Sequence, residues 1–274
     1  MGGVNHGINS SFKIEATIYN WVVISLGGSL IVPDGINTTF ISEFKKVILN
    51  QVNRGRKFII VCGGGKTARN YQGACKKLNC ESSNNILDLI RIRATNLNAL
   101  FMAGAFGNVA DQRIIKNPDK KILTDRQVIF SGGYKIGRST DFGAVRFALN
   151  IGARLVINLT NIDGVYDKNP NDENCKNVKL IKSILWSDYR AMIPKKWTYG
   201  LNSPFDPTAS REAEKKDIDV VIINGNNLKN FEHCLNGNRF KGTTIHGFLT
   251  PNLYPFKIFK RRRLHNIKDT FIYE

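Results

Sequence analysis

Short apolar runs alternate with longer amphipathic stretches along most of the chain. Two of the runs, WVVISL (21–26) and KFIIVC (57–62), are rich in β-branched residues and end in glycines, which is typical of buried strands. Between them, apolar residues recur at helical spacing over 40–52, and Asn37 or Thr38 can cap the start of that helix. A strand, a helix and a second strand in this order predict a βαβ unit, with parallel strands covered by helices.

The same alternation continues to residue 224. It predicts helices over 86–106, from about Asp141 and over 206–216, and strands over 154–159 and 218–224, the latter as the last core strand. The interval 107–140 is polar and rich in turn residues, so we expect turns there. Because no Ser/Pro-rich linker divides the chain, the pattern predicts a single α/β domain with extensions at 1–20 and 248–274.

Composition adds mainly exclusions. Hydrophobic residues make up 42% of the 274 residues, which is ordinary for a folded domain, and no apolar run is long enough to span a bilayer. The first 20 residues lack the apolar segment of a secretory signal, and the five cysteines are odd in number without a C-x-x-C spacing. We therefore expect a cytoplasmic protein without structural zinc or disulfides, in which any metal arrives with a substrate.

The net charge of +18 indicates anionic partners, either nucleic acid or phosphorylated small molecules. A solvated basic surface is the simpler explanation, because net charge constrains partners rather than fold. The densest basic cluster, residues 260–263, lies near the C-terminus and is typical of a solvated tail.

Three glycine-rich turns lie at or near strand ends: 27–29, 63–65 and 132–133. Glycine lets the backbone approach an anion closely, and ligands of open α/β sheets bind beyond the carboxyl ends of the strands. A single glycine-rich turn is explained as a tight turn of the backbone. Three such turns on one sheet favour a phosphate-binding site. The strict G-x-G-x-x-G and G-x-x-x-x-G-K-[ST] signatures are both absent, so a bound nucleotide would use a different cradle.

Polar residues that suit a phosphate site accompany these turns. Arg69 lies one helical turn beyond Gly65, where it is either an exposed helix residue or a guanidinium over the glycine turn. The segment 138–141 (RSTD) begins a helix, so its hydroxyls can serve as an N-cap or hold a phosphate. The segment 160–166 (TNIDGVY) follows a strand and can form a solvent turn or flank a purine.

In order along the chain, SLGGS (25–29), CGGGKTAR (62–69), STDFGA (139–144), TNIDGVYDKNP (160–170), DPTAS (206–210) and GTTI (242–245) resemble the amino acid kinase family. Within that family the chain is most similar to uridylate (UMP) kinases of the archaeal type. The resemblance implies a kinase domain over 21–247, built as a three-layer αβα sandwich with a mainly parallel central sheet. It further implies transfer of the γ-phosphoryl group of ATP, with Mg²⁺, to UMP in pyrimidine nucleotide biosynthesis, by a homohexamer.

The resemblance also implies roles for individual residues. Asp141 would be the organising acid near the transferred group, and Arg69 would assist it. ATP would contact Gly28, Ser29, Gly65, Arg69, Thr160, Asn161, Tyr166 and Asn169. UMP would contact Gly64, Asp88, Tyr134, Lys135, Ile136, Gly137, Arg138, Ser139 and Thr140. No residue is expected to form a metal site of the protein's own.

Two positions depart from the family pattern. Ser25 stands near the place where many relatives have a lysine in the first strand, and Lys66 or Arg69 is the candidate replacement. Asn169 stands where the family usually has an aspartate, so an ATP-ribose contact would be weaker or neutral there.

Other functions compatible with the sequence are a different phosphotransferase of the family, a molybdate/tungstate storage protein that binds ATP without turnover, and a nucleic-acid-binding protein with a degenerate kinase domain. An isopentenyl phosphate kinase would have a histidine soon after the glycine triplet, and residues 63–80 contain none. Asp88 and the STD segment favour a nucleotide over acetylglutamate, and the intact STDFGA segment and Arg69 disfavour storage.

Overall fold

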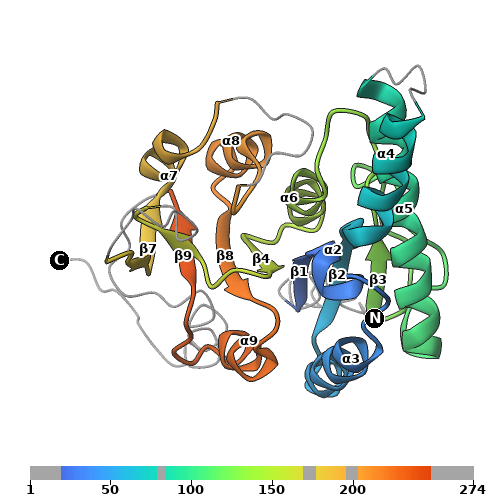
Figure 1. The fold of residues 1–274 in the computed structure, drawn as a ribbon. Coiled ribbons are helices and arrows are strands. Elements are labelled where there is room, and N and C mark those ends of the chain that lie inside the picture. Colours follow the sequence, from blue (N-terminus) through green and yellow to red (C-terminus); the bar gives the residue numbers. More distant parts are fainter. Residues whose placement is uncertain (1–19, 79–83, 169–176, 196–202, 248–274) are drawn as a thin grey trace, which may run out of the picture.

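The computed structural model describes residues 20–78, 84–168, 177–195 and 203–247 (Figure 1). Within these residues, a seven-stranded sheet has the order β3-β2-β1-β4-β8-β9-β7. Its strands are β1 (Trp21–Leu26), β2 (Lys57–Cys62), β3 (Val128–Ser131), β4 (Leu155–Thr160), β7 (Ser183–Leu185), β8 (Asp219–Asn224) and β9 (Thr243–His246). All neighbouring pairs are parallel except β8 and β9, and β5 (Val165–Tyr166) and β6 (Leu180–Ile181) form a separate small hairpin.

Helices cover both faces of this sheet. The elements are α2 (Gly28–Ile31), α3 (Thr38–Val52), α4 (Gly65–Lys77), α5 (Asn84–Phe106), the 3-10 turn η1 (Gly107–Val109), α6 (Thr140–Asn150), α7 (Trp186–Met192), α8 (Pro207–Lys215) and α9 (Leu228–Leu235). One core joins the sheet to α3, α5 and α9, and the other joins it to α6, α7 and α8 (Figure 1). The three-layer αβα fold is confirmed.

The strand sequences explain this layering. Successive residues of β1, such as Val23 and Ile24, are fully buried in opposite cores, and β2 repeats the pattern with Ile59 and Ile60. Strands buried on both faces are nearly continuous apolar runs, which is why the apolar runs at 21–26 and 57–62 identified them in the sequence.

The helix predicted between the first two strands is confirmed as α3. Asn37 is its N-cap, and the Asn37 side chain accepts a hydrogen bond from the Phe40 backbone N–H at 3.1 Å. Two expectations were incomplete. The interval 107–140 contains β3, which pairs in parallel with β2, and β8 is not the last core strand, because β9 follows it. These two strands have only four residues each, and β7, which was also not predicted, has three, so none of them is long enough to show a clear period.

The sequence motifs gather at one edge of the sheet because the parallel strands end there together. Three backbone hydrogen bonds connect the turns that follow β1, β2 and β8 to neighbouring strands: Gly27 N–H to Leu159 O, Gly63 N–H to Leu26 O, and Gly225 N–H to Thr160 O, each 2.8 Å. This edge therefore carries the candidate site. Across the described ranges, no helix is long and apolar enough to cross a membrane.

Candidate active site

The turns after β1 and β2 pack directly against each other. A Cβ atom added to Gly28 would lie 2.1 Å from the backbone N of Gly65, and one added to Gly65 would lie 2.3 Å from the Gly28 carbonyl oxygen. Gly65 also has a φ of +57°, a left-handed conformation that favours glycine. Gly64 is the N-cap of α4, and Ser29 is partly exposed in α2. These turns therefore present backbone, without intervening side chains, at the edge of the sheet.

Lys66 and Arg69, the two candidate replacements for a lysine in the first strand, both lie in the first two turns of α4. Arg69 is exposed in the second turn of α4. Lys66 is half-buried, and its ammonium group lies 3.2 Å from the carboxylate of the exposed Asp34. The exposed Arg69 guanidinium can bind a ligand without breaking a buried contact, whereas Lys66 would first have to break its ion pair with Asp34.

Asp141 connects three elements beside these turns. Its Oδ1 accepts a hydrogen bond from the Ser25 hydroxyl of β1 at 2.7 Å, and its Oδ2 accepts one from the Asp206 backbone N–H at the start of α8 at 3.2 Å. Burial of the carboxyl group raises the pKa of Asp141 to about 6, although the hydrogen bond from Ser25 opposes this change. Ser25 thus contacts the acid directly from the strand in which the family resemblance implies a lysine.

The predicted UMP-binding segment, residues 134–140, leads into α6, and we call residues 133–138 the acceptor loop. Ser139 is the N-cap of this helix and accepts a hydrogen bond from the Phe142 N–H at 3.1 Å, and Thr140 is its first residue. The Arg138 guanidinium lies over the Phe142 ring, 4.5 Å from its centre. Lys135, Ile136 and Gly137 are exposed, and Tyr134 is partly buried, so the middle of the loop is open to a ligand.

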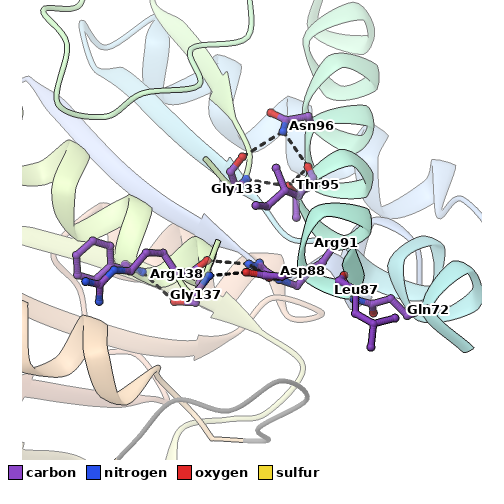
Figure 2. Close-up of polar contacts among 12 residues, drawn as sticks. Gln72, Leu87, Asp88, Arg91, Thr95, Asn96, Gly133, Gly137 and Arg138 are labelled. Atoms are coloured by element: carbon purple, nitrogen blue, oxygen red, sulfur yellow. Dashed lines mark hydrogen bonds and ion pairs between the residues drawn. The ribbon is translucent and has the colours of Figure 1, made fainter. Parts of the chain in front are cut away.

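Asp88 of α5 already has protein partners on both carboxylate oxygens (Figure 2). Oδ1 lies 2.7 Å from the Nε of Arg91, and Oδ2 accepts a hydrogen bond from the Gly137 N–H at 2.5 Å. A ribose hydroxyl that contacts this carboxylate would therefore share an oxygen atom that already accepts a hydrogen bond from the protein. The other predicted acceptor residue next to α5, Gly64, has the side chain of Thr95 within 3.6 Å of its hypothetical Cβ.

The segment after β4 lies beside a polar groove of about 700 Å³. Asp163 lies in its wall and pairs with Lys241 at 2.5 Å and with the Asn224 amide at 3.0 Å. The Lys241 ammonium, the larger of these influences, lowers the pKa of Asp163. Thr160 and the exposed Asn161 immediately precede this wall, and the Tyr166 hydroxyl donates to Asp163 at 3.4 Å. Asn169 lies outside the described residues.

Two neighbouring carboxylates of the site, those of Asp141 and Asp206, are suitable ligands for Mg²⁺. The described residues contain no cluster of three or more Asp, Glu, His or Cys side chains that could hold a metal alone. Asp206 is buried beside Asp141, and its Oδ2 has no hydrogen-bond partner, while Oδ1 caps α8 through the Ala209 N–H at 2.6 Å. Because Mg²⁺ is commonly bound by one or two carboxylates plus substrate phosphates, this pair fits an ion that arrives with ATP.

Sequence reasoning did not identify Arg91, Asp163, Asn224, Lys241 or Asp206 as site residues. Asp206 and Asn224 carried a signal, since each stands at a strand end or helix start on the edge where ligands bind. Arg91 carried none, because its importance depends on the contact of α5 with a loop 47 residues later in the chain.

Comparison with known proteins agrees with this geometry. Residues 20–224 match the model of the amino acid kinase family. The chain is 34% identical over 227 residues to the uridylate kinase of Thermoplasma acidophilum, covering 82% of this chain and 96% of that protein. It is 30% identical to that of Methanocorpusculum labreanum, covering 82% and 94%. The crystal structure of uridylate kinase from Archaeoglobus fulgidus has a TM-score of 0.69 and 28% identity, covering 82% and 99%. This chain belongs to the amino acid kinase family.

Proposed function

We propose that the protein is a UMP kinase, which transfers the γ-phosphoryl group of ATP to UMP and releases ADP and UDP. The observation that carries this proposal is the meeting, at one sheet edge, of two interlocked glycine turns, the acceptor loop and the organising acid Asp141. The uridylate kinases that the chain resembles over 82% of its length support UMP as the acceptor. UDP made in this way would supply pyrimidine nucleotide synthesis.

The donor side follows from the glycine turns and the groove. Backbone amides around Gly28, Ser29 and Gly65 would hold the ATP phosphates, because no side chain stands between them and the ligand. Thr160, Asn161 and Tyr166 would line the nucleoside site, and the Tyr166 hydroxyl donates to Asp163, which lies in the wall of the neighbouring groove. The role of Asn169 stays a prediction.

The acceptor side is formed by Gly64 and by the loop that ends in the α6 N-terminus. Ser139 and Thr140 would bind the UMP phosphate there, since their hydroxyls and the first amides of α6 lie together. Tyr134 and residues 135–138, of which the first three are exposed, would enclose the rest of the nucleotide.

Phosphoryl transfer requires in-line positioning and neutralisation of charge rather than covalent help from the protein. A UMP phosphate oxygen forms a bond to the γ-phosphorus, and the bond from that phosphorus to the β–γ bridging oxygen breaks, so ADP leaves with the bond's electrons. Asp141 and Asp206 are the carboxylates that would hold a Mg²⁺ ion arriving with ATP, which would supply neutralisation of phosphate charge. Arg69 would stabilise charge on the transferred group, and Ser25 would orient Asp141.

The test is ADP release from Mg-ATP with UMP, CMP, dCMP, AMP, acetylglutamate and isopentenyl phosphate offered separately. We expect turnover with UMP, lost in Asp141→Asn and retained in Asp125→Asn, an exposed carboxylate outside the site. Turnover with a different acceptor only, or ATP binding without turnover on any of them, would refute the proposal.

We also propose that the protein is a homo-oligomer, with the hexamer that the family resemblance implies. One face of α5 exposes Ile86, Leu89, Leu97, Leu100 and Phe101 at helical spacing. Figure 1 shows this helix at the β3 edge, on the outside of the molecule. Exposed apolar stripes commonly mark association surfaces. Light scattering should give a hexamer for the wild type and a smaller species for Leu97→Glu; a wild-type monomer would refute the proposal.

A further inference from the structure

The GTTI motif at 242–245 contacts the segment that follows β4. We call residues 160–166 the nucleoside segment. Thr243 is fully buried at the start of β9, and its hydroxyl accepts a hydrogen bond from the Val165 N–H at 2.8 Å and donates one to the Ile181 carbonyl at 2.5 Å. Val165 and Ile181 are paired with each other in the β5–β6 hairpin. One hydroxyl therefore joins the main sheet to both strands of the hairpin.

The close approach of the hairpin to β9 depends on a glycine. A Cβ on Gly164 would lie 2.5 Å from the Thr243 hydroxyl oxygen and 3.1 Å from the Thr243 nitrogen, so a side chain there would separate the two elements. Thr244, the next residue of the motif, lies on the other face of β9, and its hydroxyl has no hydrogen bond to the described residues. Of two adjacent threonines, only Thr243 is bonded to the nucleoside segment.

Lys241, just before the motif, holds the same segment through Asp163. Its ammonium group lies 2.5 Å from Asp163 Oδ2, and the Asn224 amide donates to Asp163 Oδ1 at 3.0 Å. The Tyr166 hydroxyl also donates to Oδ2, at 3.4 Å. The side chains of Lys241 and Asp163 are 65% and 27% exposed, so water screens their ion pair. We therefore expect the pair to contribute less than the buried Thr243 hydroxyl.

Together these contacts fix the surroundings of the Tyr166 ring at two points. The backbone next to the ring is held through the Val165 N–H, and the far end of the ring is held through its hydroxyl. Both anchors come from β8 and β9, which are antiparallel neighbours, so the end of β8 at Asn224 lies near the start of β9 at Thr243 (Figure 1). A residue 78 positions away in the chain can thus hold Val165.

We propose that Thr243 and Lys241 are positioning residues that hold the nucleoside segment, and with it the Tyr166 ring, in the conformation that binds the base of ATP. This inference rests on the proposed function for the identity of the donor. A segment that is already ordered loses less entropy on binding, which improves the affinity for ATP. The acceptor loop is not among the residues held in this way, so the affinity for UMP should not depend on these contacts.

Steady-state kinetics distinguish positioning from a general loss of stability. Thr243→Val removes the hydroxyl at similar volume and should raise KM for ATP about tenfold or more, while kcat and KM for UMP stay near the wild-type values. Thr243→Ser keeps the hydroxyl and should restore KM for ATP, and Thr244→Val is the matched control. Lys241→Gln should raise KM for ATP by a smaller factor, with Lys229→Gln, an exposed lysine of the same groove, as its control. A lower apparent kcat with unchanged KM for ATP would show a merely structural role and overturn the inference.

Calorimetry with Mg-ATP and no acceptor tests the same inference without turnover. Thr243→Val should bind Mg-ATP about tenfold more weakly than the wild type, and its Val165 amide should exchange faster with solvent, because this N–H has lost its acceptor. If Thr243→Val does not fold, Lys241→Gln, at an exposed position, provides the comparison. Equal affinity for ATP in the wild type and the variants would overturn the inference and leave the proposed function standing. A wild type that binds ATP without phosphorylating UMP would refute the proposed function, and the affinities would still decide the positioning role.

Discussion

Replacing Asp141 by asparagine removes a negative charge from the junction of β1, α6 and α8. The two hydrogen bonds of the carboxyl group can survive, because an amide oxygen can accept from the Asp206 N–H and an amide N–H can donate to the Ser25 hydroxyl. The substitution should therefore change the electrostatic free energy much more than the packing. We expect it to abolish turnover and to stabilise the folded protein at neutral pH.

The magnitude follows from the pKa of Asp141, which burial raises from 3.8 to about 6. A shift of about two pH units corresponds to roughly 3 kcal/mol. The folded protein binds the proton more tightly than the unfolded chain, so the wild type loses stability as the pH rises from about 4 through about 6. The asparagine variant has no such loss, and the difference should be complete above about pH 7.

Thermal unfolding of both proteins across this pH range is the assay. The asparagine variant should melt higher at about pH 8 by roughly 6–12 °C, since each kcal/mol shifts Tm by about 2–4 °C in a domain of this size. Below about pH 3 the two proteins should melt together, because Asp141 is then protonated in both the folded and the unfolded state. A variant that melts lower than the wild type at about pH 8, or a difference independent of pH, would refute the reasoning.

Four further substitutions test the phosphate side of the site. Gly28→Ala places a Cβ 2.1 Å from the Gly65 nitrogen, so the two turns must separate, and calorimetric affinity for ATP should fall about a hundredfold. Arg69→Ala should lower kcat about tenfold or more and Lys66→Ala much less; wild-type turnover in both would show that neither replaces the lysine. Ser139→Ala removes the α6 cap and should lower the stability by about 1 kcal/mol, measured by urea unfolding; an unchanged midpoint would contradict this.

The sequence predicted those parts of the fold that depend on local pattern. β1 and β2 were identified because both of their faces are buried, and α3 because its apolar stripe and its Asn37 cap lie within one continuous segment. The glycine turns at 27–29 and 63–65 could be placed at strand ends because each directly follows an apolar run in the sequence. Their contact with each other depends on the parallel register of β1 with β2.

The sequence could not predict contacts that join distant segments. The hydrogen bond between Ser25 and Asp141 spans 116 positions, and that between Asp206 and Asp141 spans 65. Arg91 is indistinguishable in the sequence from the exposed Arg93 two positions later, and only the packing of α5 against the acceptor loop separates them. The chemistry of the site therefore depends on tertiary structure, whereas its motifs are local.

The cost of the Asp141 charge also predicts how the protein responds to Mg²⁺. Both hydrogen-bond partners of this carboxyl are neutral groups, and the neighbouring Asp206 adds a second negative charge. A cation that arrives with ATP would offset the repulsion between the two carboxylates. Because the cation binds the folded state, the free energy gained in this way should raise Tm. ATP with Mg²⁺ should thus stabilise the wild type more than ATP with a chelator.

We define the Mg²⁺ increment as the rise in Tm with ATP and Mg²⁺ minus the rise in Tm with ATP and a chelator. The contribution of Asp141 is the Mg²⁺ increment of the wild type minus that of Asp141→Asn. Because the variant has already lost the unfavourable charge, Mg²⁺ has less to offset there, and the extra increment should shrink, while Asp125→Asn should respond as the wild type does. Thermal shifts at fixed nucleotide concentration measure all of these without requiring turnover. Equal Mg²⁺ increments in the wild type and Asp141→Asn would show that the ion binds away from this carboxylate and that its charge serves the fold or the acceptor instead.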